Sequence, residues 1–219
     1  MQDVRYKLVK QTTLGVALQS VLSVPTVFDG EVKMIRLTNT TGAPVTVRVC
    51  FVPKGASAVL TNAALWDYSI ASNSFVEIST QHILLAGTDI YASASSANAV
   101  NIFASVSQII DRKLVMSKAV HILSPATTYE LLKVPADADV ILTHLHVVDL
   151  TAPNSNVSVF YVEPGAVPVQ GNAALFNYLF LGHSFVEFLP GQILKAGSSV
   201  HVSSVAGATF NCFISAIQY

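Results

Sequence analysis

Hydrophobic and polar residues alternate one by one along several segments of this chain. Hydrophobic residues occupy every second position in Val45–Val52, and the same alternation holds in Ser155–Val162. It returns in residues 100–106 and in residues 210–216. A period of two places successive side chains on opposite faces of a strand. These segments therefore predict β-strands that turn one face toward a core.

Turn-forming residues separate the alternating segments roughly every 8–12 residues, a spacing typical of β-sandwiches and barrels. Gly87 and Gly197 each follow the pattern Leu-x-Ala, and we expect each to supply a turn position with positive φ. No long amphipathic helix is predicted. Residues 62–68 and 172–178 predict one short helical turn or an irregular strand. The pattern favours an all-β chain with about seven or eight strands in each half.

The two halves of the chain are copies of one unit. The phrase Ser-Phe-Val-Glu begins at Ser74 and again at Ser184, an offset of 110 residues. At this offset residues 51–109 are identical to their counterparts at 22 of 59 positions without a gap. A unit of this length is a common domain size. We therefore predict two tandem antiparallel β-sandwich domains, of immunoglobulin-like or jelly-roll type, over residues 1–110 and 111–219.

The composition indicates that the chain buries more surface than its own core. Charged residues make up 11% of the sequence, where about 25% is typical, and hydrophobic residues make up 52%. In two predicted strands, Phe103 and Phe213 lie on the face opposite the core, which predicts a second buried surface. No apolar run approaches the ~18 residues that span a bilayer, so no membrane segment is predicted. The first thirteen residues lack the apolar segment of a secretory signal.

The charge distribution argues against a nucleic-acid partner. The formal net charge is −1, and the 12 lysines and arginines are spread along the chain instead of gathered in a stripe. Binding to a phosphate backbone needs such a stripe or patch. We therefore expect no nucleic-acid binding.

Two groups of residues resemble parts of catalytic or metal sites. Glu77 and Glu187 end the repeated phrase, but as equivalents in separate domains they are not expected to form the close carboxylate pair of a glycosidase. We interpret each as an outward glutamate on a strand. His144 and His146 share one face of a predicted strand, a spacing that suits a metal. Because no third ligand with suitable spacing is evident, we interpret them as structural or surface histidines.

Other polar candidates also lack partners in the sequence. Asp137 and Asp139 lie in a predicted turn without the further oxygen ligands and glycine of a calcium loop. Ser74 and Ser184 have no nucleophile-elbow context, and no glycine-rich phosphate loop is present. We therefore predict no catalytic residue, no metal ligand and no cofactor, and the chain is not expected to be an enzyme.

Aromatic residues and cysteines complete the candidates. Trp66 and Tyr68, with their counterparts Phe176 and Tyr178, suit either an aromatic sugar platform or core and interface anchors, and we favour anchors. The two cysteines, Cys50 and Cys212, are not equivalent positions of the repeat. We expect buried free thiols and no disulfide.

The first copy contains a series of turn-and-strand strings at Val24-Pro25 and at residues 37–41, 45–49, 84–93 and 100–105. With these strings it resembles the small β-sandwich virion proteins of tailed bacteriophages. The resemblance covers nearly the whole first copy and the latter half of the second. The second copy departs from it at residues 144–146 and at Pro190-Gly191, where the first copy has Thr80-Gln81.

The resemblance implies a non-enzymatic structural component of a virion that is assembled in the host cytoplasm. Proteins of this kind usually carry one copy of the domain, so this chain resembles a tandem fusion of two. The implied partners are further copies of the chain and other virion proteins. Neck, tail, fibre base and head decoration all remain open, because fold does not fix the position. A carbohydrate-binding sandwich that takes part in host recognition is the alternative.

Overall fold

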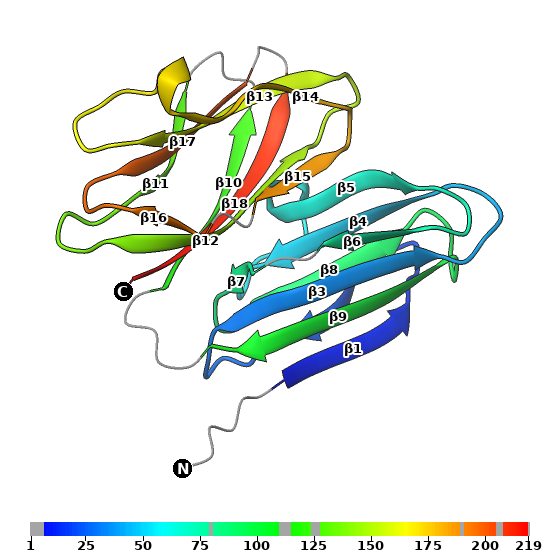
Figure 1. Cartoon of the computed structure of the whole chain (residues 1–219). Helices are drawn as coiled ribbons and strands as arrows, with labels where there is room; N and C mark the ends of the chain where they lie inside the picture. Colours follow the sequence, from blue (N-terminus) through cyan, green and yellow to red (C-terminus); the bar gives the residue numbers. More distant parts are fainter. Residues whose placement is uncertain are drawn as a thin grey trace. The chain divides into compact units, whose positions relative to one another are not determined.

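The computed structural model describes residues 7–78, 81–109, 115–123, 128–188, 191–204 and 208–218. The chain divides into two compact domains, Met1–Asp111 and Arg112–Tyr219, and each is described by itself. The boundary predicted near residues 110–113 lies outside the described residues. Figure 1 labels the strands of both domains except β2.

Domain 1 consists of two antiparallel sheets. The first sheet has the order β1-β9-β3-β6, and β7 also pairs with β3. The second sheet has the order β2-β8-β4-β5. A short 3₁₀ turn, η1 (Leu60–Asn62), precedes β5. The strands are β1 (Lys7–Thr13), β2 (Gln19–Ser23), β3 (Gly30–Asn39), β4 (Val45–Val52), β5 (Ala63–Ile70), β6 (Phe75–Ile78), β7 (Ile83–Leu84), β8 (Asp89–Ala94) and β9 (Val100–Gln108).

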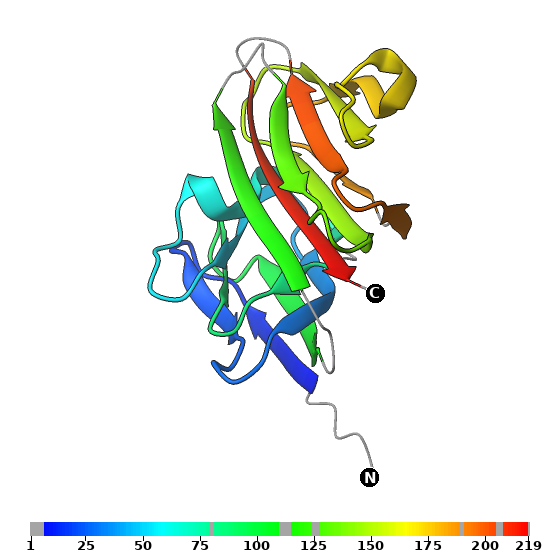
Figure 2. The same ribbon diagram turned by 90° about the vertical axis from the view of Figure 1, so that its left-hand side faces the viewer.

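Domain 2 repeats this plan strand for strand. Its sheets have the orders β10-β18-β12-β15, with β16 also on β12, and β11-β17-β13-β14. Figure 2 shows β10 beside β18, the first and last strands of the domain. The turn η2 (Gln170–Asn172) precedes β14. The strands are β10 (Val115–Leu123), β11 (Tyr129–Lys133), β12 (Val140–Asp149), β13 (Ser155–Val162), β14 (Ala173–Phe180), β15 (Phe185–Phe188), β16 (Gln192–Leu194), β17 (Ser199–Ser204) and β18 (Thr209–Gln218).

The strand order identifies each domain as a jelly roll. The first strand of each domain pairs with the last, and consecutive strands such as β3 and β4 belong to opposite sheets. Two short strands share one side of β3 and of β12, so each domain has two layers of four strand positions. Two such layers with Greek-key connections define the jelly roll. An immunoglobulin-type domain would instead pair its first and second strands within one sheet. The prediction of an all-β chain with two antiparallel sandwiches is therefore confirmed, and the jelly-roll alternative is the correct one.

A β-bulge in the central strand decides which side chains of β12 enter the core. The register of β12 against β18 shifts between Leu142 and His144. Because of this extra residue, Leu142 and Leu145 both pack in the core although they are three positions apart. The same bulge interrupts β3 between Val32 and Met34. In domain 2 this bulge places His144 and His146 on the face of the sheet opposite the core.

The repeated phrase Asn-Ala-Ala-Leu marks the junction of the 3₁₀ turn with the following strand. Asn62 accepts a hydrogen bond from the backbone N–H of Val59 (3.1 Å) and donates one to the carbonyl of Ser57 (2.8 Å). Asn172 makes the equivalent bonds in domain 2, at 2.9 Å each. Both structures predicted for residues 62–68 are present: Asn62 closes a short turn, and the residues after it form a bulged strand.

We call β3 and β12, which pair with strands on both sides, the central strands. The end of each central strand is anchored by one buried polar side chain. The amide Nδ2 of Asn39 donates to the carbonyls of Ala43, Ile70 and Ala71 at 2.7, 3.2 and 3.0 Å. Its counterpart Asp149 has only acceptor atoms, and Ser155 Oγ donates to it at 2.5 Å. Each domain thus matches its anchor to the polarity of its neighbours.

This matching predicts unequal effects of exchanging the two anchors. Asn39→Asp turns a carboxylate toward three carbonyl oxygens, and we expect it to destabilise domain 1 by about 3 kcal/mol. Asp149→Asn keeps Oδ1 as acceptor for Thr151 and places an N–H near the hydroxyl of Ser155, so we expect a loss of about 1 kcal/mol. Urea unfolding of each variant measures both values. Equal losses would contradict the assignment of donor and acceptor roles.

Both cysteines are buried in their domains as predicted, and both are free thiols. Burial raises the pKa of Cys50 to about 12, a rise that the nearby Arg48 charge only partly opposes. Burial raises the pKa of Cys212 to about 12 as well. The thiolate is the reactive form of cysteine, so both thiols are protected in the folded protein.

We expect iodoacetamide at pH 8 to label neither cysteine in the native protein at a measurable rate. A pKa of about 12 lowers the thiolate fraction about a thousandfold relative to an exposed thiol. After unfolding in urea, mass spectrometry should find two alkylated cysteines per chain. Rapid labelling of either residue before unfolding would show that its strand opens to solvent.

Candidate functional site

Strand pairing brings His144, His146 and Glu187 together on the outer face of the first sheet of domain 2. The two histidines lie on β12, and Glu187 lies on β15, directly opposite His146 in the register. His146 Nδ1 is 3.1 Å from Glu187 Oε1, and His144 Nε2 is 3.7 Å from the same oxygen. One potential ligand atom from each of the three side chains lies within 4.8 Å of the others. We call these three residues the His–Glu cluster.

The electrostatics of the His–Glu cluster favour an ionised carboxylate. Burial alone would raise the pKa of Glu187, but hydrogen bonds and charge interactions with His144 and His146 outweigh it and lower the pKa to about 2. Burial lowers the pKa of His144, which favours its neutral imidazole. The cluster therefore presents one negative oxygen to two ring nitrogens.

Aromatic rings from two neighbouring strands contact the imidazole of His146. The ring centroid of Phe185, on β15, lies 5.2 Å away in a stacked arrangement, and that of Phe213, on β18, lies 5.8 Å away. The rings of His144 and His146 are stacked at 6.1 Å. Both histidines are buried. These contacts hold the imidazoles in place against Glu187.

The same place in domain 1 contains an ordinary ion pair. Met34 and Arg36 are the counterparts of the two histidines, and Arg36 is opposite Glu77 in the register. The guanidinium donates to Glu77 Oε2 through Nε at 2.8 Å and through Nη2 at 2.6 Å. It also lies 5.0 Å from the ring centroid of Phe75. The two domains thus keep the glutamate and the aromatic ring and differ in the group that faces the carboxylate.

The sequence pattern does not reveal the His–Glu cluster, because its third member comes from another strand. We expected no third ligand for His144 and His146, and Glu187 lies 41 residues beyond His146 in the chain. The description of Glu187 as a simple outward glutamate is therefore incomplete, as it is for Glu77. The available signal was the repeat itself, which keeps this glutamate while it replaces Arg36 by a histidine.

The remaining polar candidates serve turns and strand ends. Asp139 Oδ1 accepts a hydrogen bond from the backbone N–H of Ala196 at 2.8 Å, and Asp29 does the same for Ala86 in domain 1. The carbonyls of Ser74 and Ser184 accept hydrogen bonds from the backbone of the central strands. Asp137 lies in the turn before β12. These contacts fix turns and strand register.

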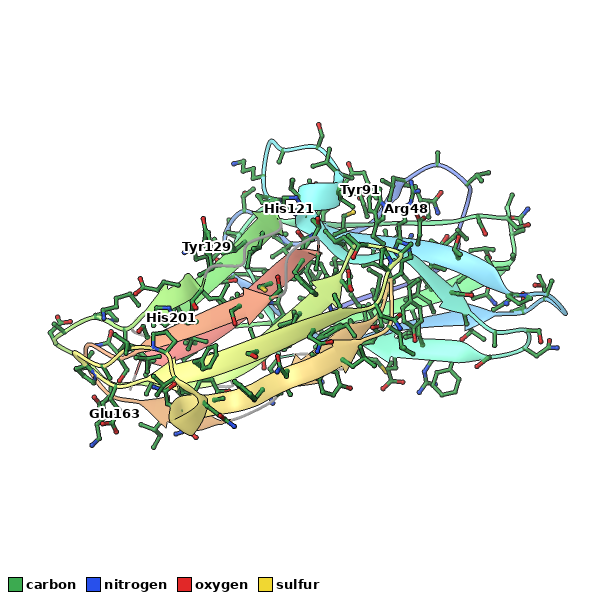
Figure 3. All side chains as sticks on the ribbon, turned by 90° about the horizontal axis from the view of Figure 1, so that it is seen from above. Arg48, Tyr91, His121, Tyr129, Glu163 and His201 are labelled. Atoms are coloured by element: carbon green, nitrogen blue, oxygen red, sulfur yellow. The ribbon has the colours of Figure 1, made fainter. Side chains whose placement is uncertain are left out.

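Two further histidines of domain 2 lie apart from the His–Glu cluster in the fold. His121 is on β10, where its Nδ1 is 2.6 Å from Asn211 Oδ1. His201 is on β17 of the other sheet, where its Nε2 is 2.8 Å from Ser199 Oγ. Figure 3 labels both side chains. Burial lowers the pKa of His201.

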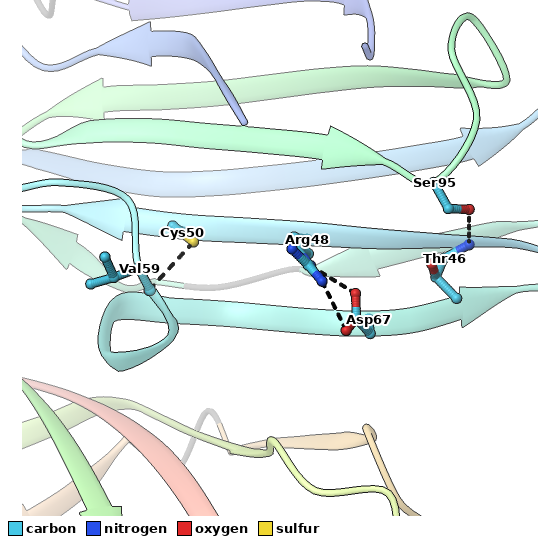
Figure 4. A network of polar contacts seen from close by, with 6 residues as sticks. All are labelled: Thr46, Arg48, Cys50, Val59, Asp67 and Ser95. Atoms are coloured by element: carbon cyan, nitrogen blue, oxygen red, sulfur yellow. Dashed lines mark hydrogen bonds and ion pairs between the residues drawn. The ribbon is translucent and has the colours of Figure 1, made fainter. Parts of the chain in front are cut away.

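An ion pair occupies the aromatic surface of domain 1 that was considered for sugar binding. Arg48 on β4 donates to both carboxylate oxygens of Asp67 on β5, at 2.7 and 3.1 Å (Figure 4). The guanidinium carbon lies 4.2 Å from the ring centroid of Trp66. The hydrogen bond with Asp67 raises the pKa of Arg48. The guanidinium covers one face of the indole, so that face of Trp66 is not free to stack on a sugar ring.

The corresponding strand of domain 2 has exposed apolar side chains in place of this ion pair. Phe176 and Tyr178 on β14 are 48% and 46% exposed. Leu179 is 55% exposed, and Leu181, just beyond the strand, is 63% exposed. We call these four residues the β14 apolar edge. Their domain 1 counterparts are Trp66, Tyr68, Ser69 and Ala71.

No helix among the described residues is long and apolar enough to cross a membrane. No protein-family model and no curated protein matches the sequence. The structure is similar to that of a protein chain in the atomic structure of Sulfolobus turreted icosahedral virus. The two chains have 13% identity and a TM-score of 0.31, over 99% of this chain and 60% of the viral chain. The chain thus spans about three fifths of the length of that protein.

Two other similar structures differ from each other in class: one is from a viral particle and one is a CBM22 tandem domain. One belongs to the T13 viral particle of IBDV, with 8% identity and a TM-score of 0.35 over 98% of this chain and 69% of the other. Another is the tandem CBM22 domain of Paenibacillus barcinonensis Xyn10C, with 11% identity and a TM-score of 0.30 over 99% and 92%. All these TM-scores are below 0.5, so the jelly-roll fold is assigned from the strand order of this chain itself.

Asp67 lies in the bulged part of β5. Substitutions at this residue separate the contribution of the ion pair to stability from that of the backbone conformation. Asp67 has a φ of 52°, and its counterpart Asn177 has a φ of 50°. Asp67→Asn keeps a residue that tolerates positive φ, and loss of the half-exposed ion pair should cost less than about 1 kcal/mol. Asp67→Val forces a β-branched residue into this conformation and should cost about 1–3 kcal/mol more. Thermal unfolding monitored by circular dichroism compares the two. A larger loss in Asp67→Asn would contradict this order.

Proposed function

We propose that this chain is a non-enzymatic structural protein of a tailed-bacteriophage virion that acts through protein–protein interfaces. The β14 apolar edge is the observation that carries the part of the proposal that concerns protein–protein interfaces. Within the virion the neck, tail, fibre base and head decoration suit such a protein, which would assemble in the host cytoplasm. Its partners in this proposal are further copies of the chain and other virion proteins, with no nucleic-acid or membrane partner.

The β14 apolar edge combines two features that favour association. β14 is the last strand of its sheet, so one side of its backbone pairs with no strand among the described residues. Its sequence, Ala-Ala-Leu-Phe-Asn-Tyr-Leu-Phe, contains no charged residue. Natural edge strands are usually protected from pairing by lysine, proline or other charges. The equivalent β5 carries Asp67, which is held by Arg48.

A second copy of the same chain is the occupant that the chemistry of this edge favours. When an edge strand pairs with its own copy, like charges on the two edges repel each other. This repulsion is avoided only where each charge meets an opposite charge of the copy. An uncharged apolar edge meets its own copy without this cost, and antiparallel pairing of β14 with β14 of the copy satisfies the free backbone groups. Exposed apolar patches of this kind mark interaction sites in soluble proteins.

The composition supports assembly into a larger structure. Only 11% of the residues are charged, and each domain has four sheet edges and two outer sheet faces to protect from nonspecific contact. Large obligate interfaces are apolar and often exceed ~2,000 Å² in total. The jelly roll is found in viral capsids, lectins and cupins, so the fold alone does not choose among them. The proposal of a phage virion rests on the resemblance of the repeated strings.

We expect the purified chain to form a closed homo-oligomer. The double variant with Leu179→Lys and Leu181→Lys should be a monomer. Two lysines from each copy would meet across the paired edges and repel. The matched control is Ser69→Lys with Ala71→Lys, the equivalent exposed positions of domain 1. Light scattering after size-exclusion chromatography measures the mass of each variant. A monomeric wild-type chain, or an unchanged mass in the Leu179/Leu181 variant, would overturn the assignment of the interface to β14.

Carbohydrate binding remains the second candidate because Phe176 and Tyr178 are about half exposed. Under this alternative the chain is a monomer that binds a glycan, and Phe176→Ala with Tyr178→Ala abolishes the binding. A glycan array followed by calorimetry on the chain tests it. Mass spectrometry of purified virions tests the structural role directly, since the proposal requires the chain to be a stoichiometric particle component.

A further inference from the structure

We propose that His144, His146 and Glu187 bind a divalent transition-metal ion of the Zn²⁺ type, which ties β15 to β12. This inference is independent of the virion role proposed above. It replaces our expectation from the sequence that the chain has no metal ligand. The geometry of the three side chains, their chemistry and the equivalent ion pair of domain 1 all support this site.

The spacing of the ligand atoms is close to that of a tetrahedral site. With metal–ligand distances of about 2.0–2.1 Å, the ligand atoms of a tetrahedral Zn²⁺ site lie about 3.3 Å from one another. In the His–Glu cluster the two nitrogens lie 3.1 and 3.7 Å from Glu187 Oε1. All three atoms lie within 4.8 Å of one another. Small side-chain rotations therefore suffice to place the three atoms around one ion.

The donor set selects the class of ion. Two imidazole nitrogens with one carboxylate oxygen suit Zn²⁺ and neighbouring transition metals, whereas Ca²⁺ and Mg²⁺ require mostly oxygen ligands. Three protein ligands leave one position of a tetrahedral ion for water. The aromatic rings of Phe185 and Phe213 hold His146 in its orientation, which lowers the cost of ordering the site when the ion binds.

Domain 1 explains why a cation is needed at this position. There the Arg36 guanidinium supplies a permanent positive charge to Glu77. Domain 2 keeps the glutamate, but its equivalent of Arg36 is His146, and the equivalent of Met34 is a second histidine. A metal ion shared by the two histidines restores the positive charge that the arginine provides. In both domains the contact joins the central strand to a four-residue edge strand, β6 or β15.

Metal analysis of the full-length chain tests the proposal. The purified protein is stripped with a chelator, dialysed against micromolar ZnSO₄ and analysed by plasma mass spectrometry, with calorimetry for the affinity. We expect one Zn²⁺ per chain, and visible absorption bands of tetrahedral Co²⁺ when CoCl₂ replaces zinc. Glu187→Gln should weaken binding at least about 10-fold, since loss of even an outer-shell partner costs about 10- to 100-fold.

The repeat provides matched variants. His144→Met with His146→Arg installs the domain 1 residues, which already face a glutamate in this register, and should bind no Zn²⁺ while it keeps its β-sheet circular dichroism. His121→Ala and His201→Ala remove histidines outside the cluster and should keep one ion per chain. The reverse exchange, Met34→His with Arg36→His, should raise the folded chain to two ions.

The outcomes separate the proposal from a cluster that is held by hydrogen bonds alone. Absence of stoichiometric Zn²⁺ or Co²⁺ binding by the wild-type chain would overturn the metal site. One ion retained by the His144→Met/His146→Arg variant would also overturn it, because the ion would then be bound elsewhere. Zinc should in addition raise the thermal unfolding temperature of the wild-type chain and leave that of Glu187→Gln nearly unchanged, since ligands stabilise only the state that binds them.

Discussion

The antiparallel pairing of each central strand on both of its sides is the constraint on which the rest of each domain depends. β12 pairs with β18 on one side and with β15 and β16 on the other. On its other side β18 pairs with β10, so the first and last strands of the domain lie next to each other, and the consecutive strands β12 and β13 belong to different sheets. Because side chains alternate along a strand, a shift of one residue would exchange the core face for the outer face. The bulge at Leu142 makes such a shift at one defined point.

The tandem repeat acts as an internal comparison of what the scaffold requires and what it permits. Both domains keep the turn asparagine before the bulged strand, the positive-φ residue within it and the glutamate opposite the central strand. They differ in the partners of these groups. Asn39 donates to backbone carbonyls, whereas its counterpart Asp149 accepts from the hydroxyl of Ser155. Arg36 becomes His146 where a second histidine is added. The scaffold thus keeps its backbone requirements and varies the chemistry on its outer surfaces.

The sequence predicted those features that depend on local patterns. Alternation of residue type identified the strands, and the repeated strings identified two domains of the same fold. It did not predict the strand order, because a period of two tells which face a side chain is on and not which strand lies beside it. The His–Glu cluster was missed for the same reason, since Glu187 reaches His146 only through the pairing of β15 with β12. The bulge at Asp67 was also hidden, although an aspartate in a hydrophobic strand is one of the few residues that tolerate positive φ.

The two proposed sites of domain 2 are neighbours along the chain, and this connection relates their energetics. The last residue of the β14 apolar edge is Leu181 and β15 begins at Phe185, so three residues separate the edge from the strand that carries Glu187. The backbone N–H of His183 in this turn donates to the carbonyl of Thr151 at 2.9 Å. A Cβ atom at residue 182 would clash with the carbonyl oxygen of Ala152, so only glycine allows this close approach. The turn is therefore fixed against the loop after β12, and an ion that fastens β15 would also restrict the end of β14. An edge strand that is ordered before it meets its partner loses less conformational entropy on association.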